Sequence, residues 1–402
     1  MSQGPLAGKN IILGVTGSIA AFKAAALASR LVQLGAAVQV AMTPAATQFV
    51  TPLTFQSLTH RPVFTNLFDP RSELSIDHVA AARSADALVI APATANVIAK
   101  LACGLADDPV TTTALATTAP IVVCPAMEHH MYCHPATQAN LELLKSRGVT
   151  VVEPEEGRLA SGQRGKGRLA DIDVIVGAIR WVLGRRGDLA GRRLVVTAGG
   201  TREAIDPVRY ITNRSSGKMG HAIAAAARDR GAAVTLITTT PPPAELAFGV
   251  EVRQVTSALE MYAAVEEAVR GADALIMAAA VADYRPAQAL DRKRKKSGGD
   301  EEIWNLELVR NPDILASVSG PFVKVGFAAE TDDVIANARA KLAAKGLAFI
   351  VANDVTAPDS GFEKDTNRVT FVYASGEVEP LPTLSKAEVA HALLDRLKPL
   401  LA

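Results

Sequence analysis

The chain has 402 residues, a length that predicts two domains at roughly 100 to 200 residues per domain. Hydrophobic residues make up 49% of it, charged residues 21%, and the formal net charge is +1, which excludes the basic excess that binding to nucleic acid requires. The three cysteines form no CxxC pair, which argues against a disulfide framework or a thiolate zinc site. No uncharged apolar run approaches the ~18 residues of a membrane span, so we expect a cytoplasmic protein without membrane or nucleic-acid partners.

The N-terminal half begins with a pattern of alternating strands and helices. A short apolar strand over residues 11–15 ends in a glycine-containing turn, and an alanine-rich helix follows over residues 19–34. Further strands are expected after Gly35-Ala36-Ala37-Val38 and over residues 88–91. A helix over residues 174–183 precedes the charged, glycine-containing stretch 184–188.

The C-terminal half repeats these features in the same order. A strand over residues 194–197, a helix over 218–230, the string Gly231-Ala232-Ala233-Val234 and a strand that begins near Ala272 match the first half. Two copies with so long a period do not suit a stacked repeat array. We predict an α/β protein of two doubly wound, Rossmann-like domains with mostly parallel sheets, residues 1–187 and 188–402.

The first turn, residues 14–20, lies where backbone amides and a helix N-terminus can hold a phosphate. It is not a GxGxxG motif. The second strand ends in Met42-Thr43, where a dinucleotide fold would place an acidic residue, so a mononucleotide fits better than NAD. A tight turn without a ligand is the alternative.

Small hydroxyl and amide groups follow other expected strands at residues 92–96 and 107–113, and residues 125–132 read Pro-Ala-Met-Glu-His-His-Met-Tyr. These segments resemble the FMN-dependent cysteine decarboxylases. The resemblance implies that the first turn and the threonine segment bind the FMN phosphate, that His78 is catalytic, and that Glu128 and Met131 contact the substrate. The implied flavin contacts are Gly17, Ser18, Ile19, Thr43, Pro92, Ala93, Thr94, Asn96, Thr111, Thr112 and Met127.

The decarboxylation that this resemblance implies requires a flavin for a chemical reason. A simple amino-acid carboxylate has no electron sink for the carbanion that remains after loss of CO2, and oxidation of the neighbouring thiol to a thioaldehyde creates one. Reduced flavin then returns the hydride to the enethiol. His78 suits a general base because the ordinary pKa of histidine lies near working pH, although an isolated histidine is more often structural.

Two residues depart from the family pattern. Glu128 stands where asparagine is common, and a carboxylate about 4 Å from the substrate carboxylate would repel it by roughly 1 to 4 kcal/mol. Glu128 must therefore be protonated, turned away, or replaced in this role by His129 or His130. Ser161 stands in the flap where the family has a cysteine, and serine is a far weaker acid than a thiol. Either another group donates the proton or the reaction stops at the enethiol; we favour the first.

The second half carries Gly199-Gly200-Thr201-Arg202-Glu203 and then a longer string, residues 206–220, rich in serine, glycine and basic residues. It is suited to an oxyanion at a helix N-terminus and is not a Walker A loop. The basic run 292–296 alone would be read as a solvated loop. The strings closely resemble the phosphopantothenate-cysteine ligases, with support from residues 278–284, 311–314, 326–331 and 352–355.

The ligase resemblance implies attack of the phosphopantothenate carboxylate on the α-phosphate of CTP, with Mg2+, and opening of the acyl-cytidylate by the cysteine amine. It gives catalytic roles to Asn213, which stabilises the mixed anhydride, to Arg209 in cysteine transfer, and to Lys293 in charge neutralisation. Implied substrate contacts are Ala279, Ala280, Asp283, Asn311, Pro312, Phe327, Lys341 and Lys345. The choice of CTP over ATP and the metal ligands stay open.

Together the resemblances imply a homo-oligomeric bifunctional enzyme of coenzyme A synthesis that takes 4'-phosphopantothenate, cysteine and CTP, with FMN and Mg2+ as cofactors. Two rivals are a nicotinamide-dependent reductase, which the missing dinucleotide signature disfavours, and an FMN-binding protein with an active ligase but a decayed decarboxylase. Glu128 and Ser161 keep the second rival open.

Overall fold

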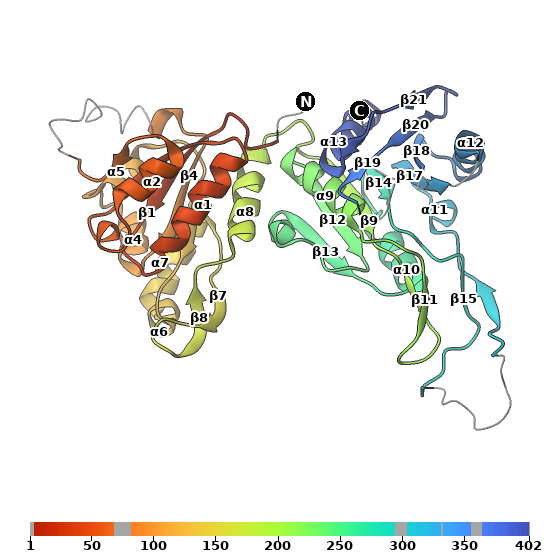
Figure 1. Cartoon of the computed structure of the whole chain (residues 1–402), viewed down its shortest axis with the longest axis horizontal. Coiled ribbons are helices and arrows are strands. Elements are labelled where there is room, and N and C mark those ends of the chain that lie inside the picture. The colour runs from red at the N-terminus through yellow and green to blue at the C-terminus, as the bar shows by residue number, and fades with distance from the viewer. Residues whose placement is uncertain (1–3, 68–81, 294–303, 331–332, 355–363, 402) are drawn as a thin grey trace. The chain divides into compact units, whose positions relative to one another are not determined.

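The computed structural model of the chain describes residues 4–67, 82–293, 304–330, 333–354 and 364–401 (Figure 1). The chain divides into two compact units, Met1–Gly184 and Arg185–Ala402. His78, the predicted base of the decarboxylase, lies outside the described residues. Within the described residues, no helix is both long enough and apolar enough to cross a bilayer.

The first unit alternates strands with helices along the chain. Its strands are β1 (Asn10–Val15), β2 (Ala37–Met42), β3 (Val63–Phe64), β4 (Ala87–Ala93), β5 (Ile121–Pro125), β6 (Thr150–Val151), β7 (Glu155–Arg158) and β8 (Arg164–Arg168). Its helices are α1 (Ala21–Gln33), η1 (Ala46–Gln48), α2 (Pro52–Thr59), α4 (Ala95–Cys103), α5 (Pro109–Ala116), α6 (His129–Cys133), α7 (Pro135–Ser146) and α8 (Ile172–Gly184).

The sheet of the first unit has the strand order β3-β2-β1-β4-β5-β6, and every pairing in it is parallel. Strands β1 and β4 are almost wholly buried, as their unbroken apolar sequences predict for strands covered on both faces. The chain leaves β1 toward β2 on one side and later returns to β4 on the other. This reversal between β1 and β4 is the topological switch point at which such sheets bind ligands.

The second unit repeats the pattern and extends it. Its strands are β9 (Arg193–Ala198), β10 (Arg202–Ala204), β11 (Tyr210–Thr212), β12 (Ala233–Thr238), β13 (Val250–Gln254), β14 (Ala274–Met277), β15 (Tyr284–Pro286), β16 (Leu308–Arg310), β17 (Val323–Glu330), β18 (Phe349–Asp354), β19 (Thr366–Asn367), β20 (Val369–Tyr373), β21 (Val378–Pro380) and β22 (Leu384–Ser385). Its helices are α9 (Lys218–Asp229), η3 (Ala244–Ala247), α10 (Ala258–Ala268), α11 (Ile314–Ser317), α12 (Val334–Lys345), α13 (Lys386–Leu397) and η4 (Lys398–Leu401).

The larger sheet of this unit runs β13-β12-β9-β14-β17-β18-β20-β21. The strands from β13 to β18 pair in parallel, and β20 and β21 add an antiparallel edge. The order β13-β12-β9-β14 repeats the order β3-β2-β1-β4 of the first unit, so the second switch point lies between β9 and β14. These sheets confirm the predicted α/β class with mostly parallel strands.

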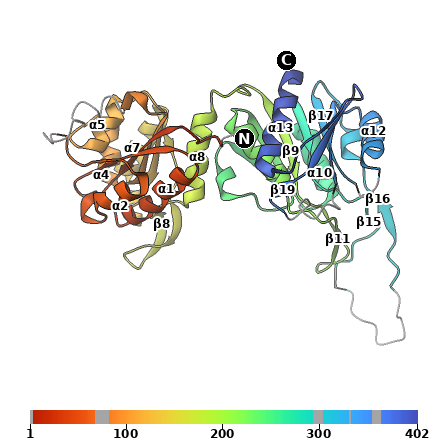
Figure 2. The ribbon, with the colours of Figure 1, turned by 45° about the horizontal axis from the view of Figure 1, so that its top comes forward.

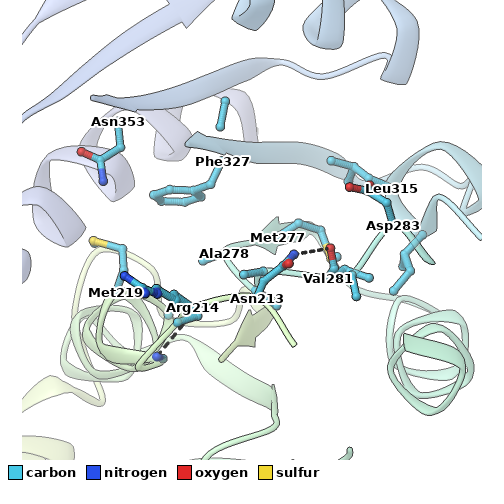
Figure 3. Close-up of a pocket in the computed structure, with 18 of the residues that line it drawn as sticks. Asn213, Arg214, Met219, Met277, Ala278, Val281, Asp283, Leu315, Phe327 and Asn353 are labelled. Atoms are coloured by element: carbon cyan, nitrogen blue, oxygen red, sulfur yellow. Dashed lines mark hydrogen bonds between the residues drawn. The ribbon is translucent and has the colours of Figure 1, made fainter. Parts of the chain in front are cut away.

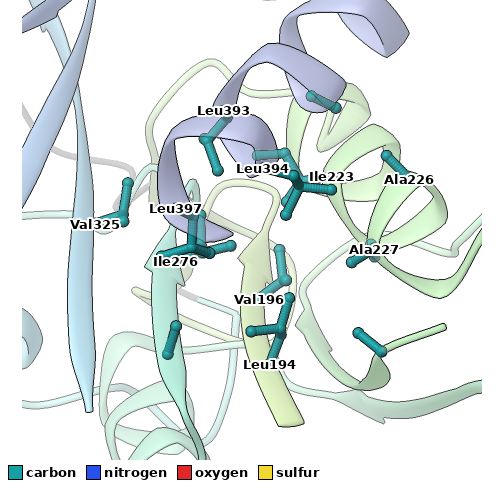
Figure 4. Packing of buried hydrophobic residues seen from close by; sticks show 14 of the residues in the cluster. Leu194, Val196, Ile223, Ala226, Ala227, Ile276, Val325, Leu393, Leu394 and Leu397 are labelled. Atoms are coloured by element: carbon teal, nitrogen blue, oxygen red, sulfur yellow. The ribbon is translucent and has the colours of Figure 1, made fainter. Parts of the chain in front are cut away.

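Alternation along β9 decides which helices cover which face of the second sheet. Leu194 and Val196 belong to one buried cluster and Val195 to another, because successive side chains of a strand point to opposite faces. Leu393, Leu394 and Leu397 of α13 pack on the first of these faces with the small side chains of α9 (Figure 4), and Figure 2 shows α13 over β9. Burial of each such leucine contributes about 1.5 to 3 kcal/mol.

Candidate functional site

The first turn of the N-terminal unit is held to the end of β4 by one hydroxyl group. Thr16 Oγ1 donates a hydrogen bond to the carbonyl of Pro92 at 2.7 Å and accepts one from the backbone N–H of Thr94 at 3.1 Å. Gly17 also passes close to the end of β2, since a Cβ atom there would lie 2.4 Å from Ala45 Cβ. The predicted flavin-contact segments at the ends of β1, β2 and β4 therefore meet at the switch point.

The predicted flavin-binding hydroxyls differ in what they contact. Thr94 Oγ1 accepts from the N–H of Val97 and caps α4, while Thr111 Oγ1 completes a capping box with Asp108. Ser18 Oγ accepts from the N–H of Ala20 at 3.3 Å. Thr112 Oγ1, by contrast, is buried and has no hydrogen-bond partner within the described part of the chain. A buried hydroxyl without a partner is costly, so Thr112 points to a polar ligand group.

A cavity of about 410 Å³ opens beside this turn. Five predicted site residues line it, namely Ser18, Ile19, Met127, Glu128 and Ser161. Its lining does not include the other predicted flavin and substrate contacts of this unit, which are Gly17, Thr43, Pro92, Ala93, Thr94, Asn96, Thr111, Thr112 and Met131. Lining residues that the sequence reasoning did not single out include Phe22, Lys23, Arg158, Arg168 and Leu169.

The flap that carries Ser161 is the hairpin of β7 and β8, and its second strand is attached to the Pro-Ala-Met segment. The N–H of Met127 donates to the Gly167 carbonyl at 2.9 Å, and the N–H of Lys166 donates to His129 Nδ1 at 3.1 Å. A Cβ on Gly167 would lie 2.2 Å from the Met127 carbonyl oxygen, so this approach requires glycine. Ser161, at the exposed end of the hairpin, is thereby held over the cavity.

Glu128 is turned toward the start of α6. Its Oε2 accepts from the backbone N–H groups of His130 at 2.7 Å and Met131 at 3.3 Å, and its Oε1 lies 3.0 Å from His130 Nδ1. Burial raises the pKa of Glu128, but the hydrogen bonds from His130 and the helix N–H groups outweigh that effect and lower the pKa. Glu128 therefore caps a helix as a carboxylate, which favours the second of the three options open from the sequence.

The C-terminal unit has a corresponding connection across its own switch point. Thr201 Oγ1 accepts from the N–H of Ala282 at 2.9 Å, and Thr197 Oγ1 accepts from the N–H of Ala279 at 3.1 Å. The backbone of Gly199 also pairs with that of Ala280 at 2.8 Å. The Ala278–Asp283 segment is thus fixed against the first turn.

A cavity of about 550 Å³ lies at this switch point, and stretches that are distant along the chain converge on it (Figure 3). Asn213 lines it and donates from Nδ2 to the Val281 carbonyl at 3.1 Å, while Phe327 lies across the cavity from Asn213. The predicted residues on its lining are Asn213, Ala279, Ala280, Asp283, Asn311, Pro312, Phe327, Lys341 and Lys345. Residues that are distant in sequence therefore form one site.

Two predicted catalytic residues lie elsewhere. Arg209 is not part of the cavity lining; its Nε donates to Asp206 Oδ2 at 2.9 Å, and its guanidinium lies 4.6 Å from the centre of the Trp304 ring. Lys293 is exposed and also lies outside the lining.

Asn311, by contrast, is a buried residue of the cavity lining. Its Nδ2 donates to the Ala282 carbonyl at 2.8 Å and so holds the segment after β14 in place.

The cavity of the second unit is rich in cations. Lys345 pairs with Asp313 at 3.0 Å and Lys218 with Asp365 at 2.6 Å. Burial and the nearby Lys218 charge lower the pKa of Lys386, which lines the same cavity. Sequence reasoning missed Lys386 and Asn367 because Lys386 follows Ser385 in an ordinary helix-capping pattern more than a hundred residues from Asn213.

Comparison with known proteins places both units. Residues 2–184 match the model of the flavoprotein family, and residues 189–400 match the "DNA/pantothenate metabolism flavoprotein C-terminal domain". Within the part of the chain that the structure describes, no group of three or more His, Cys, Asp or Glu side chains could hold a metal ion.

The similarity to curated relatives extends over both units. A coenzyme A biosynthesis bifunctional protein of Bacillus subtilis is 47% identical over 397 residues, 97% of this chain and 96% of that protein. One of Vibrio parahaemolyticus is 45% identical over 98% of this chain and 99% of its own length. A solved C-terminal domain of such a protein is 40% identical, covering 54% of this chain and 98% of that one with a TM-score of 0.44. The resemblance seen in the sequence is confirmed: the chain belongs to the family of coenzyme A biosynthesis bifunctional proteins.

Proposed function

We propose that the C-terminal unit joins cysteine to 4'-phosphopantothenate with CTP, and that the N-terminal unit decarboxylates the product with FMN to 4'-phosphopantetheine. The observation that carries the proposal is the convergence of nine predicted ligase residues, from Asn213 to Lys345, on one cavity at the second switch point. Family membership supports both halves of the proposal, because the relatives are named for two activities in coenzyme A synthesis.

The ligase half depends on charge neutralisation and positioning. Attack of the phosphopantothenate carboxylate on the α-phosphate of CTP releases pyrophosphate, and the cysteine amine then displaces CMP to form the amide. Lys218, Lys341, Lys345 and Lys386 bring positive charge to the cavity in which a triphosphate would lie. The Asn213 amide keeps one N–H on the Val281 carbonyl and has its other N–H for the mixed anhydride. Mg2+ would neutralise further phosphate charge.

The N-terminal turn fits an FMN phosphate. Gly17 permits the close approach of the first turn to the end of β2, and Thr112 Oγ1 is a buried hydroxyl that lacks a partner within the described residues. Bound there, FMN supplies the hydride acceptor and donor that decarboxylation of a cysteinyl carboxylate requires.

The chain's own groups near the substrate are those of the Met127 segment and the flap. The N–H of Met127 is already engaged by Gly167, and Glu128 caps α6, so neither position copies the asparagine contact common in the resembling family. Hydrogen bonds from the N–H groups of His130 and Met131, with His130 Nδ1 at 3.0 Å, engage the Glu128 carboxylate at the start of α6 and partly offset its repulsion of a substrate carboxylate. Ser161 holds the flap position over the cavity with a hydroxyl in place of a thiol.

The test is mass spectrometry of products after incubating FMN-loaded protein with 4'-phosphopantothenate, cysteine, Mg2+ and CTP, with ATP in parallel. We expect 4'-phosphopantetheine with CTP. Accumulation of phosphopantothenoylcysteine or its enethiol would leave the ligase standing and refute complete decarboxylation. Failure to couple cysteine with either nucleotide would refute the ligase. The homo-oligomer and the cytoplasmic location stay predictions from the sequence.

A further inference from the structure

Two cations beside the N-terminal cavity have no part in the contacts assigned above. Lys23 lies on the first turns of α1 and Arg168 ends β8, and both line the 410 Å³ cavity. A third, Arg158, ends β7 near the exposed end of the flap. The two strands of the flap and the helix after the first turn therefore all bring positive charge to one cavity.

The charges of Lys23 and Arg168 are only partly balanced by nearby acids. Arg168 Nε lies 3.6 Å from Glu155 Oε2, and Glu155 Oε1 also accepts from the N–H of Asp171. Lys23 is half-buried and forms no ion pair within the described part of the chain. Burial and then the Arg168 charge lower the pKa of Lys23, and they outweigh the opposite effects of Glu155 and Asp171. The two cations are thus close enough to repel each other, and an anion between them would relieve this repulsion.

The remaining acid on the cavity does not cancel this charge. Glu128 is held by the N–H groups of α6 and by His130. The rest of the wall is largely apolar and includes Ile19, Phe22 and Leu169. An apolar wall with neighbouring cations suits a ligand that has an aliphatic amide chain and a terminal dianion.

We infer that Lys23 and Arg168 form a subsite for the terminal phosphate of the acyl-cysteine substrate and make the N-terminal site selective for the phosphorylated substrate over its unphosphorylated analogue. This inference rests on the proposed decarboxylase function and assigns its substrate specificity. Arginine can hold a phosphate with two parallel N–H groups, and lysine acts as a point charge beside it. Each contact contributes about a tenfold preference or more.

The experiment compares two substrates on the full, FMN-loaded chain. Decarboxylation of 4'-phosphopantothenoylcysteine and of pantothenoylcysteine is measured for the wild type, Lys23→Met, Arg168→Gln and the control Arg164→Gln. Arg164 is an exposed arginine of the same strand β8 that is not part of the cavity lining. In parallel, the protein is titrated with 4'-phosphopantetheine and with pantetheine while the flavin absorbance is followed. This signal reports binding beside FMN, does not require turnover, and does not respond to binding at the ligase cavity.

We expect the wild type to prefer the phosphorylated compounds, and Lys23→Met and Arg168→Gln each to lose about tenfold in kcat/KM and in affinity for these compounds alone. Arg164→Gln should behave as the wild type. Equal losses for both substrates would overturn the subsite. So would variants that lose FMN but still bind riboflavin, because the cations would then hold the cofactor phosphate. A phosphate preference in the titration without turnover of either substrate would refute the decarboxylase and leave the subsite standing.

Discussion

The two units of this protein build the same crevice and line it with different chemistry. In the first unit Thr16 Oγ1 donates to the Pro92 carbonyl at 2.7 Å, and in the second Thr201 Oγ1 accepts from the N–H of Ala282 at 2.9 Å. In each unit a threonine hydroxyl near the end of the first strand binds the backbone of the neighbouring strand or of the segment that follows it, and Thr197 adds a second such bond in the second unit. Backbone geometry and threonine hydroxyls therefore set the frame independently of the ligand.

The difference lies in the side chains that surround the frame. The first cavity combines the apolar side chains of Ile19, Phe22 and Met127 with the cations Lys23, Arg158 and Arg168, whereas the second has four lysines, Lys218, Lys341, Lys345 and Lys386. Apolar walls suit a flat ring system and an uncharged chain, and a group of cations suits a nucleoside triphosphate. A substitution in one cavity should therefore abolish the activity of that unit and leave the activity of the other unit unchanged.

The largest effect is expected from Asn213→Ala. Removal of the amide that faces the cavity should lower the kcat/KM of cysteine ligation by roughly 10² to 10³, the range for loss of one preorganised donor. Decarboxylation of supplied phosphopantothenoylcysteine should not change. The measurement is product formation from each starting compound, with Asn337→Ala as the control, an exposed asparagine of α12 that does not line the cavity. Equal loss of both activities would contradict the separation of the units.

Acid should weaken the second unit before the first. Burial lowers the pKa of His221 in α9 to about 4 from 6.5. Between pH 6.5 and pH 4 the unfolded chain therefore binds a proton at His221 more readily than the folded unit does. The stability that this difference contributes is fully present above pH 6.5 and is lost as the pH falls toward 4. At pH 5 the free energy of unfolding should be lower by roughly 2 kcal/mol.

In the first unit the corresponding loss of stability is expected only at a lower pH. Burial raises the pKa of Glu153, but Lys166, Tyr132 and Lys145 outweigh it and lower the pKa to about 2, so its contribution stays intact down to about pH 4.5. Hydrogen exchange at pH 7 and pH 5 should show lost protection in peptides from β9 and α9 and little change in β1 and α1. His221→Gln should reduce the difference. Equal acid sensitivity of the two units would rule the explanation out.

Matched glycine substitutions in the first turns of the two units should affect FMN binding and ligation separately. A Cβ at position 17 would lie 2.4 Å from Ala45 Cβ, and a Cβ at position 200 would lie 2.5 Å from the Asn213 carbonyl oxygen. We expect Gly17→Ala to weaken FMN retention by about tenfold and to spare ligation, and Gly200→Ala to reduce ligation by a similar factor and to spare FMN. Gly4→Ala is the control, since no atom lies within 4 Å of its Cβ position. Flavin content and ligase assays on the same preparations decide the outcome.

The smallest effect should come from Ser161→Cys. A thiol at the flap position is a far better acid than a hydroxyl, so the variant should complete the reductive step faster by a few-fold. The measurement is the ratio of enethiol to 4'-phosphopantetheine in single-turnover samples, and Ser161→Ala should match the wild type. A Ser161→Ala variant that accumulates enethiol would mean that the serine hydroxyl itself donates the proton.

The sequence was sufficient for the class of fold and for the stretches that carry the sites. Short apolar strands between alanine-rich helices predict parallel sheets, and β1, β4, β9 and β14 confirm that prediction. The helix expected over residues 218–230 is α9, Lys218–Asp229. The antiparallel edge of β20 and β21 was not predicted, because an edge strand and a central strand have similar local sequences.

By itself, the sequence determined the two-fold repetition, the α/β class and the family, because local periodicity and long contiguous strings record these properties directly. Only the tertiary structure decided which residues share a cavity. It placed Lys386 on the same cavity as Asn213, turned Glu128 onto α6, engaged Arg209 with Asp206, and placed Lys23 and Arg168 on one cavity. The physical reason is that a binding site joins the ends of strands that are neighbours in the sheet but distant along the chain, so no local pattern contains it.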